Sequence, residues 1–124
     1  MATLTLTTVT LGTDDVPALV RFYARLLDWP APSIDADDAT WVAVRDPAGG
    51  VGIACQYEEF HRPAVWPGQA GAQQMMVHLE IKVDELAAGL EHALACGATL
   101  AEFQPQDDVR VCLDPAGHPF CLWV

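Results

Sequence analysis

Two side chains in this sequence have the chemistry of catalytic or metal-binding groups. His78 lies in the alternating stretch Gln74 to Val83, on the face that also carries Glu80. Its imidazole could ligate a metal, act as a general base or be held by hydrogen bonds in a cavity wall. The third role is favoured because no second histidine accompanies it. Cys121 could supply a thiolate, but no neighbour in the sequence would activate it, which favours a small buried hydrophobic side chain.

Large aromatic residues could form the walls of a pocket for a flat ligand. They are Trp41, Tyr57, Trp66 and Trp123. Alternation places Trp123 on the strand face of Cys121, pointing into a cavity. Any one of the four is most simply a core residue, but together in so small a chain they fit a pocket that stacks on flat molecules. Arg110 and Glu80 could add polar contacts or form surface salt bridges.

The element that must position His78 is a strand followed by a helix. From Gln74 to Val83 apolar residues alternate with mostly polar ones, with Met76, His78 and Glu80 on the polar face. Asp84 is the expected N-cap of a helix, and Gly97 is the expected stop in the left-handed conformation.

The same unit occurs 70 residues earlier, where Thr8 matches His78. A first strand is expected from Leu4 to Thr13, and a helix capped by Asp14 or Asp15 follows it. Two Asp-Pro-Ala-Gly turns, 68 residues apart, predict the same hairpin in each half. Each half is therefore predicted to be β-α-β-β-β, with strands near 40–45, 51–57, 99–103, 109–113 and at the C-terminal end.

The chain is expected to form one domain, with module one at about 1–57, a linker loop at about 58–73 and module two at about 74–124. Residues 30–38, with two prolines and three acidic residues, predict a loop or a poorly formed edge strand. The linker is long and carries Phe60 and Trp66, so it is either a connector packed on the surface or a loop that covers a ligand.

The net charge of −11 makes nucleic acid an improbable partner and favours a cationic ligand. No apolar run predicts a membrane span, and the N-terminal residues lack the features of a signal peptide, so a cytoplasmic location is expected. The four cysteines have no CxxC spacing and are expected to be reduced.

These features resemble the vicinal oxygen chelate superfamily, which includes glyoxalases, bleomycin-resistance proteins and extradiol dioxygenases. The resemblance rests on the two halves, on the helix sequence from Asp15 to Leu27 and on the closing motif DPAGHPFCLW at 114–123. It implies an α+β fold in which two βαβββ modules form curled mixed sheets around a shared cavity. It also implies a homodimer.

Metalloenzymes of that superfamily take ligands from the first and last strands of each half. The matching positions here are Thr8, Ile53, His78 and Cys121, of which only His78 is an ordinary ligand. The two glycines Gly49-Gly50 leave room for a one-residue shift in the first half, but the neighbours Ala54 and Cys55 offer no carboxylate either, and Gln56 could supply one ligand at most. We therefore expect no tightly held metal and no cofactor.

Two functions remain open from the sequence. The first is a small-molecule binding protein of the glyoxalase and bleomycin-resistance type that sequesters an aromatic or cationic ligand without a metal. The alternative is a metal-dependent enzyme of the same superfamily, a lyase, isomerase or dioxygenase, with a degenerate metal site. The expected ligand-binding residues are Thr8, Trp41, Ile53, Tyr57, Phe60, Trp66, Met76, His78, Arg110, Cys121 and Trp123.

Overall fold

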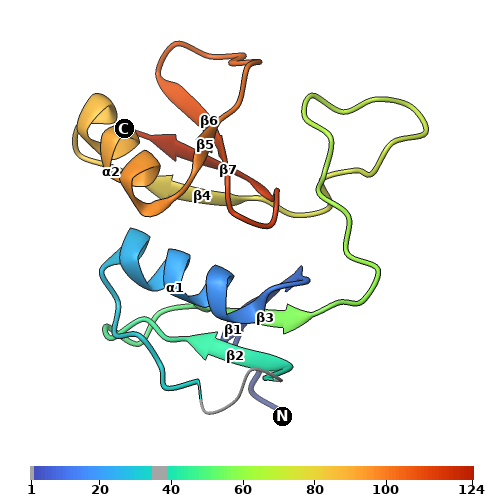
Figure 1. Cartoon of the computed structure of the whole chain (residues 1–124). Coiled ribbons are helices and arrows are strands. Elements are labelled where there is room, and N and C mark those ends of the chain that lie inside the picture. Colours follow the sequence, from blue (N-terminus) through green and yellow to red (C-terminus); the bar gives the residue numbers. More distant parts are fainter. Residues whose placement is uncertain (1, 35–38) are drawn as a thin grey trace. The chain divides into compact units, whose positions relative to one another are not determined.

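The computed structural model describes residues 2–34 and 39–124, and the chain divides into two compact units, Met1–His61 and Arg62–Val124. Each unit contains one helix and one mixed β-sheet (Figure 1). The predicted α+β class is confirmed. The boundary falls inside the predicted linker, so residues 58–61 belong to the first unit and residues 62–73 to the second. Of the expected loop or edge strand at 30–38, residues 35–38 lie outside the described residues.

The first unit builds a three-stranded sheet beside one helix. Its elements are β1 (Thr8–Thr13), α1 (Val16–Leu27), β2 (Trp41–Val44) and β3 (Gly52–Tyr57). β3 lies in the centre, parallel to β1 and antiparallel to β2. The helix begins where the Asp15 carboxylate accepts a hydrogen bond from the Ala18 N–H at 3.1 Å. Leu19 and Tyr23 on its apolar side are fully buried.

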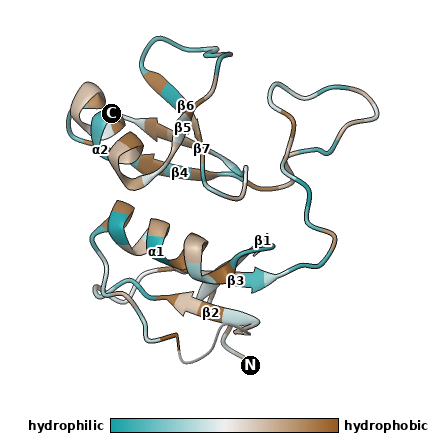
Figure 2. Cartoon of the chain, viewed as in Figure 1, coloured by the Kyte–Doolittle hydropathy of each residue, from teal (hydrophilic) through white to brown (hydrophobic). Residues whose placement is uncertain are grey.

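The second unit builds a four-stranded sheet. Its elements are β4 (Leu79–Lys82), α2 (Leu86–Cys96), β5 (Thr99–Leu100), β6 (Val109–Leu113) and β7 (Pro119–Trp123). The strand order is β4-β7-β6-β5, with β4 parallel to β7 and the other pairs antiparallel. Phe120, Leu122 and Cys112 are buried, and they share one face of the sheet because Cys112 pairs directly with Phe120. Figure 2 shows hydrophobic residues along β4 and β7 and hydrophilic ones at the tip of the β5–β6 connection.

Two predicted strands are shorter than expected at their N-terminal ends. β1 begins at Thr8 rather than Leu4, and β4 begins at Leu79 rather than near Gln74. The ladder with β7 starts only at the pair of Leu79 with Phe120, because β7 itself begins at Pro119, which has no backbone N–H. The strand expected from Thr99 to Phe103 also ends early, at Leu100.

Helix α2 confirms its predicted stop and corrects its predicted start. Gly97 ends the helix with a φ of +115°, as expected for a left-handed C-cap. The N-cap is Glu85 rather than Asp84, because the longer Glu85 carboxylate accepts from the N–H groups of Ala87 at 3.0 Å and Ala88 at 2.7 Å. In the described residues, no helix combines the length and apolar character needed to cross a membrane.

The two Asp-Pro-Ala-Gly turns have the same conformation in the two units. Gly49 and Gly117 each adopt a φ of +85°, a value at which glycine is strongly preferred. In each turn the glycine N–H bonds to the aspartate carbonyl, from Gly49 to Asp46 at 3.0 Å and from Gly117 to Asp114 at 2.9 Å. The strand that follows begins at Gly52 in the first unit and at Pro119 in the second. The first unit therefore holds one additional residue between turn and strand, which changes the alignment of the two halves.

Candidate functional site

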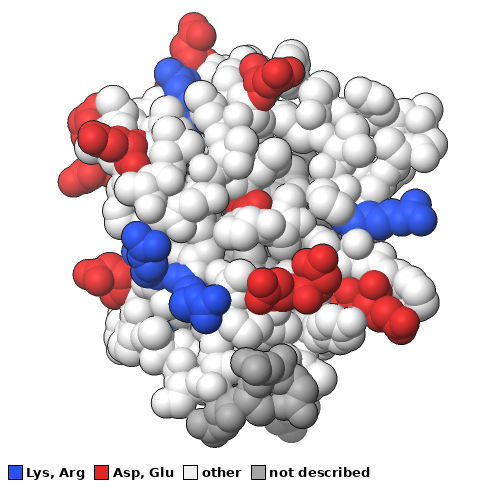
Figure 3. All heavy atoms as spheres, in the orientation of Figure 1, with Lys and Arg blue, Asp and Glu red and all other residues white. Residues whose placement is uncertain are grey.

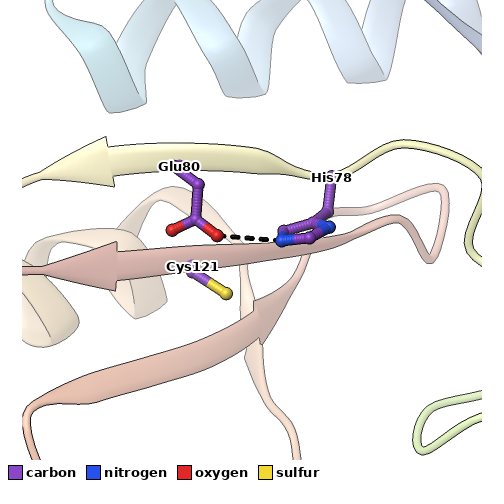
Figure 4. A group of neighbouring side chains, drawn as sticks. All are labelled: His78, Glu80 and Cys121. Atoms are coloured by element: carbon purple, nitrogen blue, oxygen red, sulfur yellow. Dashed lines mark hydrogen bonds and ion pairs between the residues drawn. The ribbon is translucent and has the colours of Figure 1, made fainter.

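Three side chains with different donor atoms converge on one face of the second sheet. Glu80 on β4 pairs directly with Cys121 on β7, so their side chains leave the sheet on the same side. His78, two residues before Glu80, points toward it, and the His78 Nε2 lies 2.8 Å from the Glu80 Oε1 (Figure 4). The nitrogen, oxygen and sulfur donors all lie within 4.8 Å of one another. Alternation places His78 and Glu80 on one face, and the pairing of β4 with β7 brings Cys121 beside them.

The cluster is only partly enclosed, which leaves its polar groups open to a ligand. The side chains of His78 and Glu80 are 38% and 52% exposed. Burial raises the pKa of the Cys121 thiol, and the negative charge of Glu80 and its hydrogen bond raise that pKa further. The thiol therefore stays protonated at neutral pH, which disfavours Cys121 as a nucleophile by itself.

Beside the cluster lies a pocket of about 150 Å³. It is lined by Trp66, Met75, His78, Glu80, Pro105, Gln106, Val111, Pro119 and Cys121, all from the second unit. Its lining combines apolar side chains, among them Trp66, Met75 and Val111, with the polar groups of His78, Glu80, Gln106 and Cys121. The pocket can therefore enclose apolar atoms and also donate, accept or carry charge, as is typical of small-molecule sites.

The wall made by Pro105 and Gln106 is held by a neighbouring glutamine. The Gln104 amide nitrogen donates to the carbonyls of Ala101 and Val111, each at 2.8 Å. Its oxygen accepts from the Val111 N–H at 2.8 Å. Because Val111 is itself in β6, these bonds tie the β5–β6 connection to the sheet beside the pocket.

The wall made by Trp66 is anchored in two places. The Trp66 indole N–H donates to the Phe103 carbonyl at 3.0 Å, and the two rings lie 6.1 Å apart between centroids. Three residues earlier, Pro63 packs against Gly117 of the closing turn. The sequence left open whether the linker packs on the surface or covers a ligand. Trp66 has both features, because it packs against Phe103 of the second unit and lines the pocket of that unit.

Several residues expected to bind a ligand do not line this pocket. Trp123 shares the face of Cys121, as alternation predicted, but it pairs with Lys82 at the far end of the strands, with the Lys82 Nζ 5.4 Å from its ring centroid. Met76 is 81% exposed, and Met75 lines the pocket in its place, because strand alternation does not extend before Leu79. Phe60, at 85% exposure, belongs to the first unit.

Arg110 lies on the face of the sheet opposite to Cys121 and does not line the pocket. Its direct partner is the buried Leu122, on the face opposite to Cys121. Its guanidinium donates to the carbonyls of Asp107 and Val109, each at 2.9 Å. On that face, burial and the nearby Cys121 raise the pKa of the Cys112 thiol to about 11, although the Arg110 charge lowers it.

In the first unit, the strand register moves Ile53 away from the ligand position that the sequence assigned to it. Thr8 and Thr10 share a face, Thr10 pairs with Ala54, and the Trp41 indole N–H donates to the Thr10 hydroxyl at 3.4 Å. Ile53 instead pairs with Val9 and Tyr57 with Thr13, so both belong to the opposite face. Since Thr10 occupies the place of Glu80, the counterpart of Cys121 is Ala54 rather than Ile53.

Sequence reasoning did not identify Glu80 as a metal donor, nor Met75, Pro105 and Gln106 as parts of the pocket. The spacing of His78 and Glu80 on one strand face was a usable signal for Glu80. No local signal identified the others, because their positions depend on where β4 begins and on the bonds of Gln104.

Comparison with known proteins identifies the family. The family model described as glyoxalase-like domain matches residues 8–123, and the chain belongs to this family. A comparison with curated proteins gives no match.

The fold is shared with solved structures of low sequence identity. A glyoxalase/bleomycin resistance protein/dioxygenase family enzyme from Burkholderia phytofirmans PsJN is 19% identical, with a TM-score of 0.66 over 94% of this chain and 95% of that one. A possible glyoxalase from Bacillus cereus is 10% identical, with a TM-score of 0.68 over 98% and 100%. The fosfomycin resistance protein FosX from Mesorhizobium loti is 15% identical, with a TM-score of 0.63 over 98% and 92%. At such identities the likeness establishes the fold alone.

The metal arrangement of the superfamily does not fit this chain. After the correction of register, its four positions hold Thr8, Ala54, His78 and Cys121. The first half thus offers one hydroxyl and one methyl group, and a neutral hydroxyl is a weak ligand for a divalent ion. A site that draws on both halves therefore lacks half of its donors.

Proposed function

We propose that this chain is a small-molecule binding protein of the glyoxalase-like family, and that the pocket of the second unit holds an aromatic or cationic group. The observation that carries the proposal is the pairing of an apolar wall, made by Trp66 and Met75, with the carboxylate of Glu80 in one pocket. An aromatic ring can stack on the indole while a positive charge approaches the carboxylate.

The size of the pocket limits the ligand. At about 150 Å³ it lies below the range of about 300–1,000 Å³ that is common for drug-sized ligands. A cavity of about this volume in another protein accommodates benzene. We therefore expect one ring or one compact cationic group to enter, with any larger ligand extending beyond the pocket.

The charge of the chain supports a cationic ligand. Seventeen acidic residues outnumber six basic ones, and Figure 3 shows acidic side chains in several places on the face drawn. The resulting field would attract cations and repel anions, and salt should weaken capture mainly by slowing association.

A calorimetric titration with three ligands of similar shape tests this proposal. Benzylamine, which is cationic at neutral pH, should bind more tightly than benzyl alcohol, and benzyl alcohol more tightly than benzoate. The titrations contain a chelator, so that no metal takes part. Absence of saturable binding in all three would refute the proposal, and so would a preference for benzoate.

Two variants and one matched control separate the contributions of the Trp66 ring and the Glu80 charge to ligand binding. Trp66→Ala should weaken the aromatic amine by about 2- to 12-fold, the equivalent of one lost aromatic contact of about 0.5–1.5 kcal/mol. Glu80→Gln should remove the preference for the cation while neutral binding persists. Trp41→Ala, a change to a partly exposed tryptophan of the first unit, should have no effect.

A second function has a specific observation in its favour. The convergence of His78, Glu80 and Cys121 is compatible with a metal-dependent enzyme of the family, such as a lyase or dioxygenase. That alternative requires a bound metal, whereas capture of a ligand as proposed above does not. Metal content of protein purified without a chelator distinguishes the two.

Assembly as a homodimer, expected from the resemblance, is also proposed. Each of the two small sheets ends in edge strands, β1 and β2 in one and β4 and β5 in the other, and unpaired strand edges are a physical reason for self-association. Sedimentation at micromolar concentration should give twice the chain mass of 13.4 kDa, and a single species of chain mass would exclude a stable dimer.

A further inference from the structure

We infer that His78, Glu80 and Cys121 form a binding site for a thiophilic divalent cation of the zinc type, built within the second unit alone. The donors are one imidazole nitrogen, one carboxylate and one sulfur, and all lie within 4.8 Å of one another. Glu80 lies on β4, His78 directly precedes that strand, and β7 supplies Cys121 beside Glu80. The site needs no residue from the first unit. It differs in this from the metal site of the superfamily, which takes donors from both halves and for which Thr8 and Ala54 of this chain are unsuitable.

The observed separations are close to those that a zinc ion would impose. With bonds of about 2.0–2.1 Å to nitrogen and oxygen and about 2.3 Å to sulfur, tetrahedral donors are roughly 3.3–3.6 Å apart. The His78 and Glu80 donors, at 2.8 Å, would open slightly, and the sulfur would move inward from at most 4.8 Å. Rotation of partly exposed side chains can provide such movements without a change in the sheet.

The donor set selects the kind of metal. Sulfur and imidazole favour zinc or cobalt over magnesium and calcium, which prefer oxygen ligands. On binding, the Cys121 thiol releases its proton to solvent and the sulfur bonds to the metal. The proton that the His78 Nε2 shares with Glu80 moves to Nδ1 through solvent, so that the Nε2 lone pair and the Glu80 carboxylate can each bond to the metal.

The position of the site leaves room for a further ligand. All three donors also line the pocket bounded by Trp66 and Met75. A fourth position on the metal can therefore face the pocket and take a water molecule or an oxygen atom of a small molecule. This inference shares its residues with the proposed function but does not depend on it, because it requires no organic ligand.

Titration of tag-free protein with Co²⁺ alone and with Zn²⁺ alone tests the site. One equivalent of Co²⁺ should produce thiolate-to-cobalt charge-transfer absorption in the near ultraviolet, and Zn²⁺ should bind with the same stoichiometry and displace it. Cys121→Ser should abolish this absorption. His78→Ala and Glu80→Gln should weaken Zn²⁺ binding by at least about 10- to 100-fold, the loss known for residues that only support a metal ligand.

Cys96→Ser is the matched control, because Cys96 also lies beside a histidine, with its sulfur 3.7 Å from the His92 Nε2. It should leave cobalt absorption and zinc affinity unchanged, and circular dichroism should show that every variant is folded. Absence of stoichiometric binding would overturn the inference. So would absorption that persists in Cys121→Ser or that is lost in Cys96→Ser. Since these titrations contain no organic ligand and the benzylamine titrations contain a chelator, each proposal can fail without the other.

Discussion

Replacing the two equivalent turn glycines by alanine separates backbone strain from packing in a single chain. Gly49 and Gly117 have the same φ of +85°, so each alanine carries the same conformational cost of about 1–2 kcal/mol. Reduced freedom of the unfolded chain offsets about 0.4–1 kcal/mol of it. Around Gly49 an added Cβ would meet nothing within 4 Å, and we expect a net loss of about 1 kcal/mol in Gly49→Ala.

Gly117→Ala has an additional effect, because its Cβ would overlap Pro63. The clash involves the Pro63 side chain and also its Cα, at 3.1 Å, so the backbone of the linker must move. Overpacking of this kind typically costs about 1–3 kcal/mol. We therefore expect Gly117→Ala to lose about 2–4 kcal/mol in the free energy of unfolding, clearly more than Gly49→Ala.

Urea unfolding followed by circular dichroism measures both losses, and hydrogen exchange localises the second. The Val65 N–H bonds to the Gln73 carbonyl at 2.9 Å within the linker, and its exchange should accelerate in Gly117→Ala but not in Gly49→Ala. Equal destabilisation by the two substitutions, with unchanged exchange at Val65, would refute the claim that Pro63 fixes the linker that carries Trp66.

Three further predictions concern the pocket and the two shifted thiols. Trp66→Phe should lower the free energy of unfolding by about 0.5–1.5 kcal/mol, because the hydrogen bond to the Phe103 carbonyl is lost. Trp66→Ala should lower it by about 0.5–1.5 kcal/mol more, because the ring contact with Phe103 is lost as well. Urea unfolding in which Trp66→Phe is the less stable variant would contradict this. Because burial raises the pKa of Cys112 from 9.0 to about 11, the folded state keeps a proton that the unfolded state loses in this range, and the free energy of unfolding should fall by about 2 kcal/mol from pH 9 to pH 11. Cys112→Val should remove that part of the pH dependence in urea unfolding, and an unchanged slope would contradict the assignment. Glu80→Gln removes the negative charge that, together with burial, raises the pKa of Cys121, so iodoacetamide should alkylate Cys121 faster at pH 8, as measured by peptide mass. An unchanged or slower rate would disprove the coupling.

The sequence was sufficient where structure depends on local chemistry. The alternation from Val109 to Leu113 predicted both ends of β6, and Gly97 predicted the end of α2, because a left-handed residue there strongly favours glycine. The repeated turns likewise predicted two hairpins whose glycines have the same φ. The α+β class then follows from the order of these elements.

Local chemistry did not predict the register between paired strands or the residue at which a strand begins. The single additional residue after Gly49 moves the counterpart of Cys121 from Ile53 to Ala54, which alternation within β3 does not reveal. The start of β4 at Leu79 likewise determines that Met75 rather than Met76 reaches the pocket. Both depend on the bonding of parallel strands that are distant in the sequence.

Glu80 shows why this register matters for function as well as for fold. The sequence places it on the face of His78, but only the parallel pairing of β4 with β7 brings Cys121 beside it. The same carboxylate is the expected partner of a cationic ligand and one of three donors for a metal ion. It cannot serve both at full strength, because a bound divalent cation neutralises the charge that attracts the ligand. The two proposed occupants of the site therefore exclude each other, and the metal available to the protein would determine whether its pocket selects a cation or an oxygen donor.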